Sequence, residues 1–327
     1  MSQRQALIDY TLHLADDALI LGHRNSQWTG HGPILEQDIA LSNIALDLIG
    51  QARNFYQYAA KLLQEEEAEV VRQGISDDPE MAVAGALQTG NANLMKPVTE
   101  DSLAYLRDSW DFKNCLLVEQ DNGDWGKTIL RQFFFSSYQY CLYAHLQGSR
   151  DAQLAAIAEK SYKEVSYHLR WSSEWVIRLG DGTPESHQRM ERALDDLWKY
   201  TGELFLPSAY EKQLTAGGIA PDLSLLRPMW EERLRAVMEG AALGLPGAAG
   251  AGGRGEGGRA EGGRIEGGPV KGGRADGGRI EEGPADGGNA KGIRMLTGGK
   301  EGRHTEQLGY LLAEMQFLQR AYPGCQW

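Results

Sequence analysis

The sequence predicts an all-α protein built as a long antiparallel helical bundle, and its clearest evidence lies in residues 35–63. That segment has no proline and a single glycine, and strand-like alternation is nearly absent from the whole chain. At about 1.5 Å per residue, a helix of this length would span roughly 40 Å. Apolar residues recur there at alternating steps of four and three, the pattern of a helix packed lengthwise against others: Leu41, Ala45, Leu48, Ala52, Phe55, Ala59 and Leu62.

The remaining helices follow from similar patterns and from helix-ending residues. A first helix is predicted at 5–27, ended by Gly30, Gly32 and Pro33, with the stripe Leu7, Thr11, Leu14, Ala18 and Leu21. A third is predicted at 125–147. A fourth is predicted at 149–179, with Ser149 as the N-cap and Gly180 as the stop. Shorter helices are expected at 185–205, 222–241 and 305–322. Residues 65–124 read as a loop-rich connector with one polar helical piece near 101–110.

Residues 245–302 differ in composition from the rest of the chain. They hold more than half of its 41 glycines, in an imperfect repeat of units such as GGRGE, GGRAE and GGRIE. Such a segment cannot bury enough apolar area to offset its ordering entropy, so we expect a flexible, disordered insertion. An arginine-glycine tract for nucleic acid is the weaker alternative, because acids balance the bases and no aromatic residue offers stacking. The predicted organisation is a helical bundle at 1–244, the insertion at 245–302 and a C-terminal helix at 303–327 that packs back on the bundle.

Composition narrows the classes of partner. The net charge of −12 argues against nucleic acid or an anionic membrane, and no apolar run reaches the roughly 20 residues that a membrane span needs. The three scattered cysteines and the polar N-terminus suggest a reduced compartment and no secretion signal. We therefore expect a soluble cytoplasmic protein.

Long antiparallel bundles are where carboxylate-bridged di-iron sites are built, from glutamates and Glu-x-x-His pairs on facing helices. The single Glu-x-x-His match is Glu301 with His304, at the exit of the glycine-rich segment and outside any predicted helix. Residues 35–63 contain no histidine. No acid lies between residues 127 and 147, where Gln132, Ser136 and Tyr140 stand instead. The sequence therefore predicts no metal site, no cofactor site and no catalytic residue in this chain.

The nearest candidate ligands are Glu164 and His168, spaced by four residues on the fourth helix and on one face with Trp171 and Trp175. They could form a weak single-metal or proton-relay pair, but a partly buried Glu–His hydrogen bond beside the two tryptophans is the favoured interpretation. On other helices, His13 and Asp17 are expected to form a surface pair one turn apart. Asp47, together with Gln51 or Arg53, is expected to make a polar contact between helices.

Several segments resemble one family, the C subunit (PaaC family) of bacterial phenylacetyl-CoA 1,2-epoxidase, a ring-epoxidising oxygenase. They are GHGPILEQDIALSNIALDLIGQARNFYQYAA, LLVEQDNGDWGKTILRQFF, SRDAQLAAIAEKSYKEVSYHLRWSSEWVIRLGDGT, LWKYTGELF and HTEQLGYLLAEMQFLQRAYPGCQW. These runs cover most of the chain outside 65–110 and 245–302, in the family's order. Both excepted segments are longer than the resemblance leads us to expect.

The resemblance implies a ferritin-like bundle that acts as the non-catalytic scaffold of a multicomponent monooxygenase in phenylacetate degradation. It implies a homologous catalytic A subunit that holds the di-iron centre, a small B subunit, and a separate reductase carrying NADPH, FAD and an Fe–S cluster. Two other functions stay open from the residues alone. One is an independently active iron-dependent oxidase using Glu164 and His168, and the other is an interaction protein with no oxygenase partner.

Overall fold

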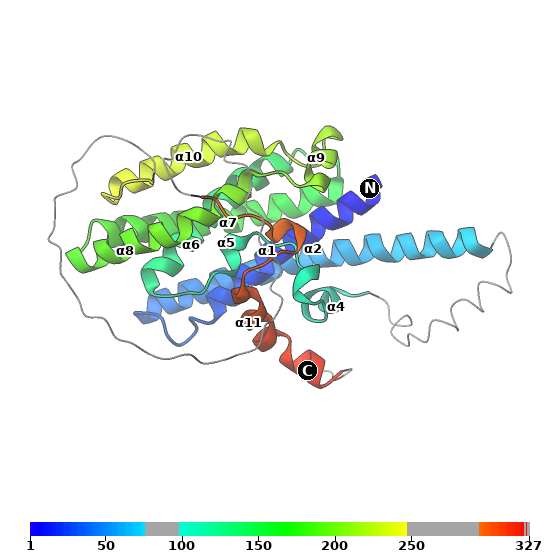
Figure 1. The fold of residues 1–327 in the computed structure, drawn as a ribbon, viewed down its shortest axis with the longest axis horizontal. Helices are drawn as coiled ribbons and strands as arrows, with labels where there is room; N and C mark the ends of the chain where they lie inside the picture. The colour runs from blue at the N-terminus through cyan, green and yellow to red at the C-terminus, as the bar shows by residue number, and fades with distance from the viewer. Residues whose placement is uncertain (76–97, 247–293, 324, 326–327) are drawn as a thin grey trace, which may run out of the picture.

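The computed structural model describes residues 1–75, 98–246, 294–323 and 325, and all regular structure in those residues is helical. Four long helices form the bundle: α1 (Gln3–Ser26), α2 (Leu35–Ile75), α6 (Trp125–Leu146) and α7 (Ala152–Gly180) (Figure 1). The pairs α1–α2 and α6–α7 make the most extensive helix contacts. The predicted all-α, ferritin-like antiparallel bundle is confirmed.

The apolar seam predicted on α2 is the buried face of that helix. All seven seam residues, from Leu41 to Leu62, are buried. The helix itself is longer than predicted, because it continues to Ile75 and extends beyond the other helices of the bundle (Figure 1). The part of α2 that packs into the core is therefore the part that carries the seam.

Helices α1 and α6 are buried on most of their sides, not only on one stripe. The reason is a second layer of shorter elements, since α5 (Leu116–Glu119) and α9 (Ala209–Ala216) contact α1. Likewise α8 (Pro184–Leu197) and α10 (Leu223–Gly240) contact α6. Polar residues on these two central helices consequently lie in the interior and need partners there.

Helix boundaries mostly follow local chemistry, with one correction. The N-cap of α7 is Asp151, whose Oδ1 accepts from Leu154 N at 2.8 Å. Ser149, predicted as the cap, instead donates its hydroxyl to Ile219 O at 2.7 Å. The helix ends at Gly180, as predicted, and a Cβ there would lie 2.4 Å from Ala241 O, so the close approach requires glycine.

The connector and the C-terminal part are more structured than predicted. The connector contains α4 (Glu100–Tyr105) and α5, and the region predicted as one helix at 185–205 divides into α8 and two 3-10 turns. Helix α9 was not predicted, and it begins with a capping box of Ser208 and Glu211. Two helices, α11 (Glu306–Met315) and α12 (Phe317–Ala321), stand where one was expected.

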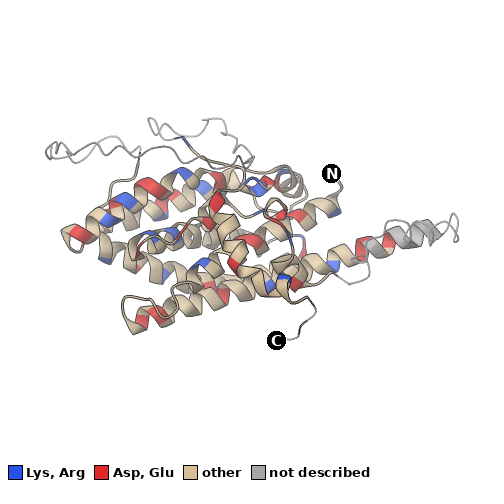
Figure 2. Ribbon diagram, turned by 60° about the horizontal axis from the view of Figure 1, so that its bottom comes forward, with Lys and Arg blue, Asp and Glu red and all other residues tan. Residues whose placement is uncertain are grey.

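The predicted flexible insertion lies mostly outside the described residues, which resume at 294. Residues 294–302 are placed against the bundle: Leu296 N donates to Lys199 O at 2.8 Å, and Thr297 and Lys300 are buried. The boundary predicted at residue 302 is therefore placed too far toward the C-terminus. In the described part, no helix is long and apolar enough to cross a membrane. Acidic and basic residues are intermixed over the helices in the view of Figure 2.

Candidate functional site: the polar interior of the bundle

A chain of polar side chains crosses the bundle from α6 through α2 to α7. Gln139 Nε2 donates to the hydroxyl of Tyr143 at 3.3 Å, and that hydroxyl donates to Gln51 Oε1 at 3.4 Å. Gln51 Nε2 then donates to Glu164 Oε2 at 2.9 Å. Burial, with nearby carboxylates adding to it, raises the pKa of Tyr143, so its hydroxyl keeps the proton that it donates. The chain is made of amides and a phenol, and its one acid is at the α7 end.

The second candidate ligand, His168, lies one turn further along α7 and contacts α2 as well. Its Nε2 is 3.0 Å from Asp47 Oδ2, and the imidazole is fully buried. The Glu–His hydrogen bond predicted between Glu164 and His168 is absent from the described hydrogen bonds, because each side chain takes a different partner on α2. Asp47 and Gln51 do make polar contacts between helices, Asp47 with His168 and Gln51 with Glu164, whereas Arg53 pairs with Glu100.

The two tryptophans on the same face of α7 extend this seam toward the start of α2. The indole N–H groups of Trp171 and Trp175 both donate to Gln37 Oε1, at 3.0 and 2.7 Å. The edge of Trp125 meets both rings, with centroids 6.1 and 5.9 Å apart. One face of α7 thus carries Glu164, His168 and both indoles onto α2, as their spacing predicted.

One contact between α1 and α6 is made of neutral groups only. Asn25 Nδ2 donates to Gln132 Oε1 at 2.6 Å, and Gln132 Nε2 donates to Ser136 Oγ at 2.7 Å. All three side chains are buried. Gln132 and Ser136 are two of the residues that the sequence places where a bridging glutamate would be expected.

These groups do not fit a di-iron centre. Such a centre needs glutamates from all four helices and two Glu-x-x-His pairs. Across the described parts of the chain, no three His, Cys, Asp or Glu side chains are placed to hold a metal ion. Around Gln51 and Gln132 the facing side chains are instead amides, hydroxyls and the carboxylate of Glu164, which bind one another by hydrogen bonds. The one imidazole on this face of α7, His168, contacts a single carboxylate, Asp47.

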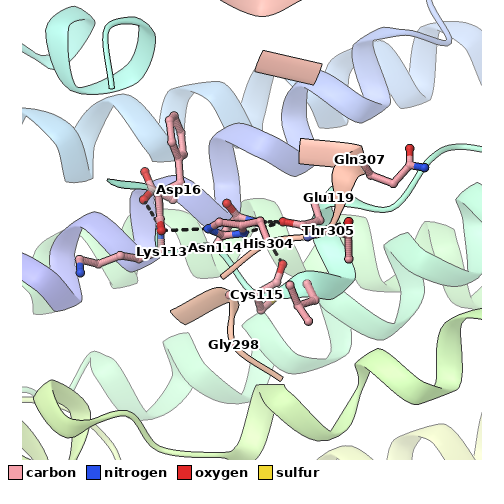
Figure 3. A network of polar contacts seen from close by, with 12 residues as sticks. Asp16, Lys113, Asn114, Cys115, Glu119, Gly298, His304, Thr305 and Gln307 are labelled. Atoms are coloured by element: carbon pink, nitrogen blue, oxygen red, sulfur yellow. Dashed lines mark hydrogen bonds and ion pairs between the residues drawn. The ribbon is translucent and has the colours of Figure 1, made fainter. Parts of the chain in front are cut away.

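A second polar network joins the connector to the C-terminal segment (Figure 3). Its centre is Glu119, a fully buried carboxylate at the end of α5. Asn114 Nδ2 donates to it at 2.9 Å, and Thr305 donates from both its backbone N–H and its hydroxyl, at 2.7 and 2.8 Å. His304 Nδ1 lies 2.8 Å from the same carboxylate. Glu119 therefore connects α5 with the start of α11.

His304 is held on both ring nitrogens, so its protonation state can be deduced. Its Nε2 is 3.0 Å from Phe112 O, and a carbonyl can only accept, so Nε2–H donates. Nδ1–H donates to Glu119 in the ion pair. Burial alone lowers the pKa of His304, but Glu119 outweighs it and raises that pKa above its usual value. His304, which the sequence places outside any predicted helix, is thus held firmly on both ring nitrogens, whereas Glu301 pairs with Arg303 on the surface.

Other buried acids fix neighbouring segments in the same way. Glu203 accepts the backbone N–H groups of Leu116, Gly298 and Gly299, each at 2.7 Å. Both carboxylate oxygens of Glu211 accept hydrogen bonds from the ammonium of Lys300, each at 3.1 Å. Burial alone raises the pKa of Glu211, but Lys300 and His13 outweigh it, so that pKa lies below its usual value.

His13 and Asp17 are a buried pair, not the surface pair that was predicted. His13 Nε2 lies 3.6 Å from Asp17 Oδ2, and both side chains are almost inaccessible to solvent. The i, i+4 spacing was correct, but α5 and α9 cover this side of α1. Asp17 Oδ1 accepts from Cys115 N at 2.7 Å, and burial raises the pKa of Asp17. This pair positions the connector and has no described access to a substrate.

Sequence reasoning did not identify the buried charged residues of this second network. Glu119, Glu203 and Lys300 belong to loops or short helices that carry no periodic pattern. Only Glu211 had a usable signal, since Ser208 and Glu211 form the S-x-x-E pattern of a helix start. Apart from Asn114, which is five residues from Glu119, the partners of the others named above are 87 to 186 residues away in the sequence, a separation that no local motif encodes.

Comparison with known proteins gives a consistent result. The family model described as phenylacetic acid catabolic protein (PaaA_PaaC) matches residues 1–262 and 291–327. A curated relative, the C subunit of 1,2-phenylacetyl-CoA epoxidase from Escherichia coli (strain K12), is 39% identical over 323 residues. That alignment covers 98% of this chain and 99% of the relative.

Proposed function

Since the chain belongs to the phenylacetic acid catabolic protein family, we propose that it is the C subunit of a phenylacetyl-CoA 1,2-epoxidase. In this proposal it is a non-catalytic scaffold in a multicomponent, NADPH-dependent monooxygenase of phenylacetate catabolism. A homologous A subunit holds the di-iron centre and binds the CoA ester. A small B subunit and a reductase with FAD and an Fe–S cluster complete the complex.

The observation that carries this proposal is the hydrogen-bonded chain from Gln139 through Tyr143 and Gln51 to Glu164. An iron-binding bundle needs carboxylates and imidazoles that point at a common centre. Here the facing side chains are amides, a phenol and one carboxylate, and they bind one another by hydrogen bonds. Iron binding would have to break these hydrogen bonds without supplying enough ligands in return.

The same hydrogen bonds support a scaffolding role physically. Hydrogen bonds between buried side chains of different helices favour one arrangement of those helices. The network of Glu119 and His304 fixes the connector and the C-terminal segment onto the same body. A rigid bundle of this kind offers a catalytic partner a fixed surface along its length.

Reconstitution tests the proposed function directly. The A subunit would be assayed for epoxidation of phenylacetyl-CoA with reductase and NADPH, alone and together with this chain. We expect activity to depend on both chains, and this chain with the reductase to be inactive by itself. Turnover by this chain without the A subunit would support the iron-dependent oxidase alternative and contradict the scaffold. Failure of the two chains to co-purify would favour a free-standing interaction protein.

A further inference from the structure

The exposed aromatic side chains of this chain are concentrated at one edge of the bundle. In the described residues, all of them except Tyr167 belong to two short segments, 106–110 and 310–322. Together with two leucines they form a surface that we call the C-terminal patch, in which each side chain is 48% to 69% exposed: Leu106, Trp110, Tyr310, Phe317, Leu318 and Tyr322. Exposed apolar patches rich in aromatic residues are typical of surfaces that bind other proteins.

Hydrogen bonds join the two segments into one surface. Arg320 Nη2 donates to Arg107 O and to Asp108 Oδ1, both at 2.9 Å. Gln316 Nε2 donates to the same Arg107 carbonyl at 2.9 Å, and the Gln316 side chain is buried. Beyond this base, α11 and the end of the chain project from the bundle (Figure 1). The patch is therefore fixed at its base, whereas its apolar side chains are open to solvent.

A hollow of about 530 Å³ lies within the C-terminal patch. Its lining includes Phe317 and two small residues one turn apart on α11, Gly309 and Ala313. A Cβ on Gly309 would meet nothing within 4 Å, so the space above this residue is open. Small residues beside exposed rings leave room for a large apolar side chain of a partner, as in the central pockets of protein interfaces.

The two arginines of these segments already face carboxylates of this chain. Arg107 pairs with Asp16 on α1. Arg320 pairs with Asp108 at 2.9 Å. Both positive charges are thus compensated inside the chain, so they do not favour an anionic partner.

Three exposed acids in or next to the two segments give the patch an acidic rim. They have no ion pair within the part of the chain that the structure describes: Asp111, Glu306 and Glu314. Asp111 follows Trp110 directly, and the two glutamates lie one turn before and one turn after Tyr310 on α11. Two arginines act on these acids at longer range, Arg24 and Arg107, but both guanidinium groups are already bound inside the chain. The rim therefore favours lysine and arginine on the surface that covers it.

A second copy of this chain does not supply such a surface in the usual two-fold arrangement. Two-fold pairing would place the patch against itself, with the acids of one rim next to those of the other. An anionic membrane is disfavoured for the same reason. The complementary occupant is a different protein with positive charge around apolar side chains.

We propose that the C-terminal patch binds an amphipathic helix of another protein, with a large apolar side chain in the hollow and lysine or arginine on both flanks. The patch reaches from Tyr310 on α11 to Phe317 at the start of α12, about two helical turns further on. A helix with apolar residues at a matching spacing covers that length in one contact. The site is separate from the polar interior, and it does not require that the chain be an epoxidase subunit.

The test titrates the full chain into a fluorescently labelled synthetic helix of about 18 residues, with leucine on one face and lysine on both flanks. A second peptide carries glutamate at every lysine position. Phe317→Ala removes a ring of the patch, Gly309→Leu fills the hollow, and Leu225→Ala changes a similarly exposed residue on α10 as the matched control. We expect the lysine peptide to bind. Both patch variants and the glutamate peptide should weaken the affinity by at least about tenfold, and the control should change it by less than about twofold. Because all three residues are exposed, the melting temperature of each variant should stay close to that of the unmodified chain.

Each other outcome overturns the proposal. Equal affinity for the two peptides contradicts a cationic partner. Unchanged binding in either patch variant, or equal weakening by Leu225→Ala, places the peptide elsewhere on the chain. Absence of binding at about 100 μM removes the proposed occupant, and self-association that is lost in Phe317→Ala makes a second copy the occupant instead. None of these results bears on the reconstitution assay, so this proposal and the proposed function fail independently.

Discussion

Gln51 on α2 donates a hydrogen bond to Glu164 on α7, with 2.9 Å between Nε2 and Oε2. An amide facing a carboxylate is a complete contact that requires no metal. In an iron-binding bundle the same place would carry a second acid, and two facing carboxylates would need a cation between them. This one contact therefore supports the scaffold role proposed for the pair α2 and α7.

The first prediction concerns Glu164 itself. Glu164→Gln should keep the hydrogen-bond geometry with Gln51, and because the site is partly exposed, the stability cost should stay below about 1 kcal/mol. We expect epoxidation by the reconstituted complex to stay within about twofold of the unmodified rate. Steady-state turnover with phenylacetyl-CoA checks this. A loss of about a hundredfold or more would assign Glu164 to the chemistry.

The second prediction compares the two faces of α2. Leu48 is fully buried in the inner seam, so Leu48→Ala should destabilise the isolated chain by about 2–5 kcal/mol. Leu46, two residues away on the outer face, should cost at most about 0.5 kcal/mol when changed to alanine. Urea unfolding of both variants measures the difference. Similar costs at the two positions would show that the seam is wrongly placed.

The third prediction concerns the close approach of Gly299 to the connector. A Cβ at this residue would lie 2.2 Å from Asn114 O, a backbone atom that cannot move aside cheaply. Gly299→Ala should therefore destabilise the chain by more than about 2 kcal/mol. Gly309→Ala in α11 is the control, because its Cβ would meet nothing within 4 Å and helix propensity favours alanine. Thermal unfolding should show a lower melting temperature only for Gly299→Ala.

The fourth prediction is a pH dependence of the C-terminal anchor. Glu119 raises the pKa of His304 above its unfolded value of about 6.5. The ion pair therefore stabilises the fold in full below that pH and loses its contribution as pH rises through the folded-state pKa. At pH 6, His304→Gln should cost about 3 kcal/mol, the order for breaking a buried pair.

The measurement is the difference in unfolding free energy between the unmodified chain and His304→Gln across a pH series. The difference should shrink as the pH becomes alkaline. His31→Gln changes an exposed histidine and serves as the control, for which only a small difference is expected. A His304→Gln difference that grows with pH would contradict the assigned charge state.

Periodic patterns in the sequence were sufficient for the bundle but not for its polar interior. The seam from Leu41 to Leu62 was predicted because burial on a helix repeats at a fixed spacing. The contacts of Glu164 with Gln51 and of His168 with Asp47 were not predicted. The reason is that the choice of partner depends on how the two helices are placed relative to each other. The spacing of Glu164 and His168 on α7 permitted a mutual hydrogen bond, and the packing of α2 provided nearer partners.

The second network shows a different limit of sequence reasoning. His304 follows the glycine-rich segment and lies outside any helical pattern, so its burial could not be inferred from its neighbours. It is buried because Glu119, far away in the sequence, supplies a charge at 2.8 Å. The same applies to His13 and Asp17, whose exposure depends on α5 and α9 covering α1. All of these environments depend on which distant elements of the fold cover the residue, and local spacing in the sequence does not encode that.

Iron quantified separately on each subunit of the co-purified complex tests the central claim most directly. The scaffold account predicts iron on the A subunit, roughly two per chain, and no stoichiometric iron on this chain, whether it is isolated or separated from the complex. Glu164→Ala and His168→Ala in this chain should leave the iron content of the complex unchanged. About two irons bound to this chain and lost in those variants would contradict the account.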